Sequence, residues 1–246
     1  MTTQRARYLG MAALLNAASP FAVAYRRLAN VVGGRIRARK GLPEHSVQRA
    51  RRFLEWCRTY DAVRDGDRAL EVGTGWVHWE SMILRLFYDV EITLFDVWDN
   101  RQLPALRCYA SQLEARLDQL GSFDPSRVER ARRTLTLVAG ATSFEALYRA
   151  LGMTYLIDPR GSLARLDDGA YDLLYSYSVL QHVQRDIAAD AVKEYRRVLA
   201  PGGTSIHWVD LGDQLVYLAG LGALCVKNYL RYSDDAWRRY FDNGIV

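Results

Sequence analysis

The sequence predicts an α/β fold, in which a mainly parallel sheet lies between layers of helices. Three observations predict it. Residues 69–72 form a short apolar strand that runs into a glycine turn and a helical pattern, and residues 90–95 form a second strand that ends in an acid. Residues 171–183 and 197–209 then repeat the alternation of strand, turn and helix. Strands that alternate with helices along a chain form parallel sheets.

The glycine turn after the first strand predicts a ligand pocket. Gly73 and Gly75 let the backbone turn sharply and approach a ligand closely. A helical pattern follows at once, and the free N–H groups at its start attract a polar or negative group. Its apolar face is expected to contain Trp76, Trp79, Ile83 and Leu86. A tight turn that binds nothing is the alternative interpretation of this motif alone.

An acid follows the second strand. Asp96 stands about twenty residues after the glycine turn, where the carboxylate that accepts hydrogen bonds from a ribose diol is expected in nucleotide-binding folds. Glycine turn and acid together therefore predict a nucleoside-containing ligand.

The other elements follow in order. A helix is expected over 44–63, and the leucine spacing of 103–120 predicts a long amphipathic helix that ends at Gly121. Ser143 caps a short helix to residue 151, residues 153–157 form a third strand that Pro159 stops, and residues 186–199 form an amphipathic helix.

Four motifs carry a resemblance to a known family. They are Glu-Val-Gly-Thr-Gly at 71–75, Asp96, Tyr-Asp-Leu-Leu at 171–174, and Arg-Val-Leu-Ala-Pro-Gly-Gly at 197–203. In this order and spacing, residues 44–210 resemble the class I S-adenosylmethionine-dependent methyltransferases. Residues 207–213 and 228–237 are similar to a bacterial subgroup, methyltransferase type 11.

The resemblance implies a Rossmann-like three-layer sandwich with strand order 3-2-1-4-5, the cofactor S-adenosyl-L-methionine, and methyl transfer to a small-molecule or envelope or secondary-metabolite acceptor at oxygen or nitrogen. Asp158 could contact the adenine amino group, or Ser162 could make this contact instead. The cofactor site that it implies comprises Glu71, Gly73, Thr74, Gly75, Asp96, Asp158, Ser176 and Ser178. No metal site is expected.

The candidate general bases are His182, His207 and Asp210, near the carboxyl ends of the fourth and fifth strands. His207 has the weaker claim, because strand alternation can turn it away from the pocket that Asp210 faces. His182 follows Gln181, where the family often has glutamate, and packing is the alternative role of this histidine. Alignment of the reacting atoms can supply ~7–11 kcal/mol, against roughly 3–5 kcal/mol for a base, so a base is not essential.

The basic residues concentrate near the start of the chain. Residues 1–68 contain fourteen Lys/Arg and five Asp/Glu, a balance of +9, whereas residues 69–246 contain nineteen and twenty-three, a balance of −4. We expect a basic helical arm over 1–43, interrupted at Ser19-Pro20 and broken at Gly33-Gly34, and a methyltransferase domain over 44–246. The arm could be a lid, could adhere to anionic lipid, or could be merely solvated, and nucleic acid is not an expected partner because stacking aromatics are absent from it.

The cysteine spacing and the apolar runs indicate the compartment in which the protein is expected. The three cysteines have neither disulfide-framework nor metal-ligand spacing, which predicts a reduced, cytoplasmic setting. No signal peptide is expected, and the longest charge-free apolar run, 215–226, is shorter than the ~20 residues of a membrane helix.

The end of the chain departs from the family. No closing hairpin of strands six and seven is recognisable after residue 210, so a catalytically inactive methyltransferase-like partner protein is the alternative function. Residues 215–226 are expected to cover the fifth strand or to form a homodimer interface. A nicotinamide dehydrogenase is disfavoured, because position 78 is histidine where the third glycine would stand.

Overall fold

The structure is a computed structural model that describes residues 3–18, 21–183, 185–213, 215–216 and 227–240. These residues fall into two compact units, one of residues 32–209 and one of residues 1–31 with 210–246. The boundary predicted at residue 43 stays a prediction.

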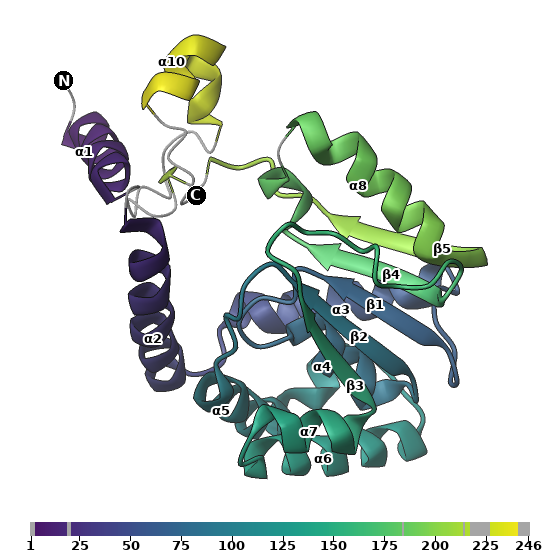
Figure 1. The fold of residues 1–246 in the computed structure, drawn as a ribbon. Helices are drawn as coiled ribbons and strands as arrows, with labels where there is room; N and C mark the ends of the chain where they lie inside the picture. Colours follow the sequence, from purple (N-terminus) through teal and green to yellow (C-terminus); the bar gives the residue numbers. More distant parts are fainter. Residues whose placement is uncertain (1–2, 19–20, 184, 214, 217–226, 241–246) are drawn as a thin grey trace. The chain divides into compact units, whose positions relative to one another are not determined.

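The larger unit is built on a five-stranded parallel sheet in the order β3-β2-β1-β4-β5, as predicted (Figure 1). The strands are β1 (Arg68–Val72), β2 (Glu91–Asp96), β3 (Met153–Ile157), β4 (Tyr171–Tyr177) and β5 (Leu199–Trp208). The central strands are apolar on both faces because helices cover both. Their carboxyl ends meet at one edge, where the glycine turn and Asp96 lie.

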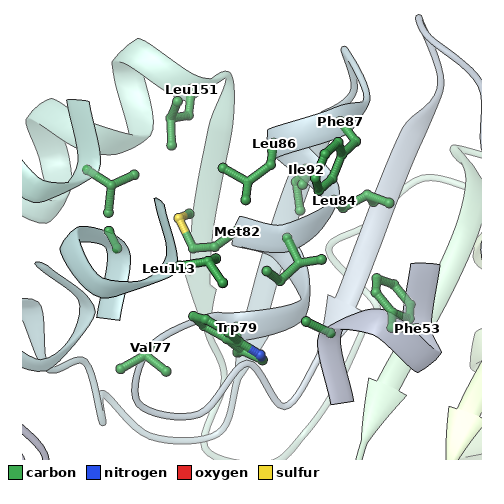
Figure 2. Packing of buried hydrophobic residues seen from close by; sticks show 14 of the residues in the cluster. Phe53, Val77, Trp79, Met82, Leu84, Leu86, Phe87, Ile92, Leu113 and Leu151 are labelled. Atoms are coloured by element: carbon green, nitrogen blue, oxygen red, sulfur yellow. The ribbon is translucent and has the colours of Figure 1, made fainter. Parts of the chain in front are cut away.

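Most helices of this unit pack on one face of the sheet. They are α3 (Glu44–Thr59), α4 (Trp79–Phe87), α5 (Leu103–Leu113), α6 (Pro125–Gly140) and α7 (Phe144–Leu151). Figure 2 shows how Trp79, Met82 and Leu86 of α4 meet side chains such as Leu113 of α5 in the main core. Alternate strand residues reach the opposite face, where Leu70 and Leu174 pack with Tyr195 of α8 (Arg185–Val198).

Two expectations about these helices need correction. The helix expected over 103–120 becomes a 3₁₀ helix from Glu114 to Leu120, because the tighter winding keeps Leu117 and Leu120 buried before Gly121 turns the chain at φ +120°. Helix α4 begins at Trp79, so Trp76 lies in the preceding turn and is exposed instead of sharing the buried helix face.

Helix α6 was not expected from the sequence. Asp124 caps it by accepting a hydrogen bond from the backbone N–H of Arg127, and Pro125 occupies its first turn. The Asp-Pro pair was therefore a start signal that the sequence analysis did not use.

The predicted helix break at Gly33-Gly34 is wrong. Helix α2 (Ala22–Lys40) continues through both glycines and ends at Gly41, which has φ +75°. The glycines provide space: a Cβ on Gly34 would lie 3.2 Å from the side-chain Cδ of Gln102. They allow a close approach between α2 and the segment before α5.

The smaller unit contains α1 (Thr3–Ala18), a 3₁₀ helix (Asn228–Arg231) and α10 (Asp234–Tyr240). Its core joins Tyr8 and Leu15 of α1 to Leu215 and Val216. The Tyr8 hydroxyl donates to Asp213 Oδ2 at 2.8 Å, and this buried carboxylate also accepts from the N–H of Leu215. The predicted interruption at Ser19-Pro20 lies outside the described residues, as does most of the 215–226 segment.

Two further findings concern the described ranges alone. No strand follows β5 in them, and none of their helices combines the length and apolar character that crossing a membrane requires.

Candidate cofactor site

The glycine turn joins β1 to the tip of β2. Gly73 and Gly75 have φ of +72° and +62°, the left-handed region that favours glycine. The N–H groups of Gly73 and Thr74 donate to the carbonyl oxygen of Phe95 at 2.7 and 3.3 Å. The turn is therefore fixed against the residue that precedes Asp96.

The two glycines have different surroundings. A Cβ on Gly73 would lie 2.3 Å from Cγ2 of Val179, which belongs to the loop after β4, whereas a Cβ on Gly75 would have nothing within 4 Å. Gly73 thus permits packing of that loop. Gly75 faces open space, as a backbone that lies against a ligand must.

Asp96 bridges the two strand tips. Its Oδ2 accepts a hydrogen bond from the N–H of Gly75 at 2.9 Å, and its Oδ1 accepts from the N–H of Val97 at 2.7 Å. The side chain is buried, and burial raises its pKa while the N–H donors of Gly75, Trp98 and Val97 oppose that shift. Each carboxylate oxygen can accept more than one hydrogen bond, so capacity remains for a diol.

Two polar side chains in this region have buried atoms without partners among the described residues. They are the hydroxyl of Thr74, in the turn, and the amide nitrogen and oxygen of Gln181, in the 3₁₀ helix Leu180–His182 after β4. An unsatisfied buried polar group costs about 1–3 kcal/mol, which a polar ligand would offset. S-adenosylmethionine, with its diol, amino and carboxylate groups, fits this set of groups.

Gln181 was not among the residues predicted for the cofactor site. In the sequence it was only the replacement for a family glutamate, and its burial depends on the chain that packs around it. No pattern in the sequence signals that burial.

Glu71 lies behind the turn rather than in it. Its Oε2 accepts a hydrogen bond from the Ser81 hydroxyl of α4, which also contacts the Tyr175 hydroxyl at 2.6 Å. Burial, followed by the nearby Glu80 carboxylate, raises the pKa of Glu71 well above its usual range. The structure places this carboxylate in a buried network that holds α4 under the turn, and its predicted contact with the cofactor stays a prediction.

His207 is held by two serines. Its Nδ1 lies 2.7 Å from Ser176 Oγ and its Nε2 lies 2.7 Å from Ser205 Oγ, while the ring stacks on Tyr195 of α8 at 5.4 Å between centroids. Burial lowers the pKa of His207. Both ring nitrogens are therefore engaged on the α8 face of the sheet.

Ser178, His182 and Asp210 were also predicted to belong to the site, and each lies in a different segment. Ser178, with φ +55°, donates its N–H to the carbonyl of Trp208 at 2.8 Å, and His182 has an exposed side chain in the 3₁₀ helix after β4. Asp210 belongs to the smaller unit, where its carboxylate accepts from the N–H of Gly212.

Asp158 follows β3 beside the tip of β2. Its N–H donates to the backbone oxygen of Asp96 at 3.1 Å, and its carboxylate accepts from the N–H of Arg160. Ser162 accepts from the N–H of Ala164 instead. The structure therefore brings the glycine turn, Asp96 and Asp158 to one edge of the sheet.

An aromatic and cationic cluster adjoins the turn, and the sequence analysis did not anticipate it. The guanidinium of Arg37 lies 3.5 Å from the centre of a Trp76 ring, and its NH1 donates to Oε1 of Gln102 at 3.1 Å. The N–H of Gln102 donates to the carbonyl oxygen of Trp76. The glycine pair at 33–34 was the only trace of this contact in the sequence.

Comparison of the sequence with protein-family models also supports a methyltransferase domain. The model of the methyltransferase domain family matches residues 131–207, which include β3, β4 and β5 but not the glycine turn. No curated protein matches the sequence significantly.

Several solved structures are similar to part of this chain. A proposed S-adenosyl-L-methionine-dependent methyltransferase from Methanococcus maripaludis is 12% identical, with 80% of this chain and 68% of that chain covered and a TM-score of 0.42. Phosphoethanolamine N-methyltransferase 2 of Haemonchus contortus is 14% identical, with 73% and 34% covered and a TM-score of 0.41. A SAM-dependent methyltransferase from Thiobacillus denitrificans is 15% identical, with 67% and 48% covered and a TM-score of 0.34. The alignment thus spans less than two thirds of the latter two proteins.

Family match, sheet order and strand-edge site agree with one another. The sheet order confirms the predicted Rossmann-like fold, and the family match over residues 131–207 agrees with a methyltransferase domain of the S-adenosylmethionine-dependent kind.

Proposed function

We propose that the chain transfers the methyl group of S-adenosylmethionine to an oxygen or nitrogen atom of a small-molecule acceptor, such as an envelope or secondary-metabolite intermediate. The observation that carries the proposal is the Asp96 carboxylate, held by the N–H of Gly75 at the adjoining tips of β1 and β2. This arrangement supports a ribose diol at Asp96 and an extended ligand along the turn.

The residues would act mainly by positioning. Bound S-adenosylmethionine supplies a methyl group on a sulfonium, which is already a good leaving group, so alignment of the acceptor dominates the rate. Asp96 would hold the ribose, and the Thr74 hydroxyl and Gln181 amide would hydrogen-bond other polar groups of the cofactor. His182 is the remaining candidate base of the larger unit, because both ring nitrogens of His207 are engaged.

Product identification tests the proposal. Cell extract is incubated with the protein and S-adenosylmethionine labelled in the methyl group, and labelled products are sought by mass spectrometry. We expect a labelled small molecule with the unaltered chain and much less of it with Asp96→Asn. Labelled protein or nucleic acid as the sole product would contradict the small-molecule acceptor.

The alternative is an inactive methyltransferase-like partner protein. The engagement of His207 and the lack of a strand after β5 within the described ranges favour it. Cofactor binding without any labelled product would support this alternative, and product formation that His182→Ala reduces by 10-fold or more, on the order of a general base's contribution, would exclude it.

A further inference from the structure

Helix α2 exposes its apolar side chains. Phe21, just before the helix, is 71% exposed and Leu28 is 66% exposed, and Tyr25, Val32 and Ile36 are exposed as well. The spacing of these five residues along the sequence is four, three, four and four, so they form one stripe along one side of the helix. A contiguous exposed apolar stripe of this kind marks an interaction surface.

The opposite side of the helix is mainly polar, with Val23 as an exposed apolar exception. In the larger unit it meets the segment before α5 through Gly34, which touches the Gln102 side chain, and through Arg37, which binds Gln102 and Trp76. The anchoring contacts of α2 are therefore polar or made by glycine. The apolar stripe is not needed to attach the helix.

The charged residues near the stripe are all basic. Residues 1–40 contain eight Lys/Arg and no Asp/Glu. Arg27, Arg35 and Arg39 are exposed, and none of the three forms an ion pair within the described ranges. An apolar stripe with flanking arginines suits the boundary between lipid headgroups and acyl chains, where the apolar side chains are buried and the cations meet anionic headgroups.

We propose that α2 is an interfacial helix that binds the surface of an anionic lipid bilayer. This interaction goes beyond methyl transfer and does not depend on it. A second copy of the chain is a poorer occupant, because pairing two α2 helices would bring together two segments without a single acidic residue. Nucleic acid would satisfy the arginines but not the apolar stripe.

Vesicle cosedimentation tests the proposal with the full chain. The vesicles are pure phosphatidylcholine, or phosphatidylcholine with about 30% phosphatidylglycerol, at low salt and at about 500 mM salt. We expect binding to the anionic vesicles alone, and a steep loss of binding at high salt. The Arg27→Gln, Arg35→Gln, Arg39→Gln triple variant should bind about 100-fold more weakly.

Matched variants show whether vesicle binding depends on the apolar stripe itself or on any loss of an exposed leucine or arginine. Leu28→Ser should weaken vesicle binding by about 10-fold, and Leu230→Ser, at a leucine of similar exposure, 69%, should leave it unchanged. Arg132→Gln with Arg196→Gln removes exposed arginines elsewhere and should have little effect. Circular dichroism verifies that each variant is folded.

Three outcomes would overturn the proposal. One is no binding to anionic vesicles at low salt, and another is binding that Leu28→Ser and Leu230→Ser reduce equally. The third is a dimer that Leu28→Ser dissociates, seen by light scattering, with no vesicle binding, which would identify the stripe as a contact between copies.

Discussion

At the residue scale, His78 combines a strained backbone with complete burial. It has φ +45°, a region that residues other than glycine seldom adopt, and it directly precedes α4. Its Nε2 lies 2.7 Å from the Tyr148 hydroxyl, and its ring packs against Phe144 and Tyr155. The position that argued against a dehydrogenase in the sequence is thus a core position that shapes the end of the glycine turn.

The lowered pKa of His78 predicts that the folded protein loses stability in acid. Burial, followed by the charge of Arg101, lowers its pKa from 6.5 to about 3, so the folded protein holds the neutral ring. The unfolded chain takes up a proton near pH 6.5, so this contribution to stability is complete above that pH and is lost as the pH falls toward about 3. By pH 5 the free energy of unfolding should have decreased by about 1–2 kcal/mol.

Denaturant unfolding between pH 7 and pH 5 checks this prediction. His78→Asn removes the titrating ring, and asparagine tolerates the left-handed backbone, so the variant should lose most of the pH dependence even if it is less stable throughout. His45→Asn, at an exposed histidine whose pKa is also lowered by partial burial, serves as the control and should retain most of the dependence. An unchanged slope in His78→Asn would refute the assignment.

Single residues also show which features of the site a local sequence pattern can predict. Gly75 and Asp96 were identified because their chemistry depends on backbone freedom and strand position, both of which a local pattern contains. The hydrogen-bond partner of Glu71 and the buried amide atoms of Gln181 were not predicted, because they depend on α4 and on the loop after β4. Such long-range packing leaves no periodic signal.

At the element scale, α2 shows how a glycine pair can serve packing rather than a turn. Gly34 lies in mid-helix, where glycine costs about 1 kcal/mol relative to alanine, and the close contact with Gln102 compensates for that cost. Propensity alone predicted a break there, and tertiary packing overrode it. For α6, in contrast, the capping signal at Asp124 was present in the sequence and was not used.

Gly34→Leu should therefore destabilise the protein by about 1–3 kcal/mol, because the added side chain would collide with Gln102. Thermal unfolding of the single variant, of Gln102→Ala, and of the double variant forms the test. In the Gln102→Ala background the penalty should shrink, and Gly10→Leu, in a helix position with nothing within 4 Å, should show no such coupling. Additive effects of Gly34→Leu and Gln102→Ala would show that the contact does not explain the glycine.

At the scale of the whole molecule, the alternation of strands and helices predicted a parallel sheet, and the strand order followed from the family resemblance that the four motifs carry. The division into two units did not, because residues 210–246 cluster with residues 1–31, which are distant in the chain. The buried hydrogen bond from Tyr8 to Asp213 joins residues 205 positions apart, and no local pattern predicts such a pair.

S-adenosylmethionine should bind at the glycine turn and Asp96, and the proposed methyl transfer depends on this binding. Titration calorimetry with S-adenosylmethionine, on the unaltered chain, Asp96→Asn and Gly75→Val, tests it most directly. Loss of the charged acceptor should weaken binding by roughly 2–3 kcal/mol, about 30- to 150-fold, and Gly75→Val should abolish it, because valine cannot readily adopt φ +62°. One-to-one binding with this pattern is the predicted result. Equal affinity in the unaltered chain and in Asp96→Asn, or no binding by the folded unaltered chain, would contradict the claim.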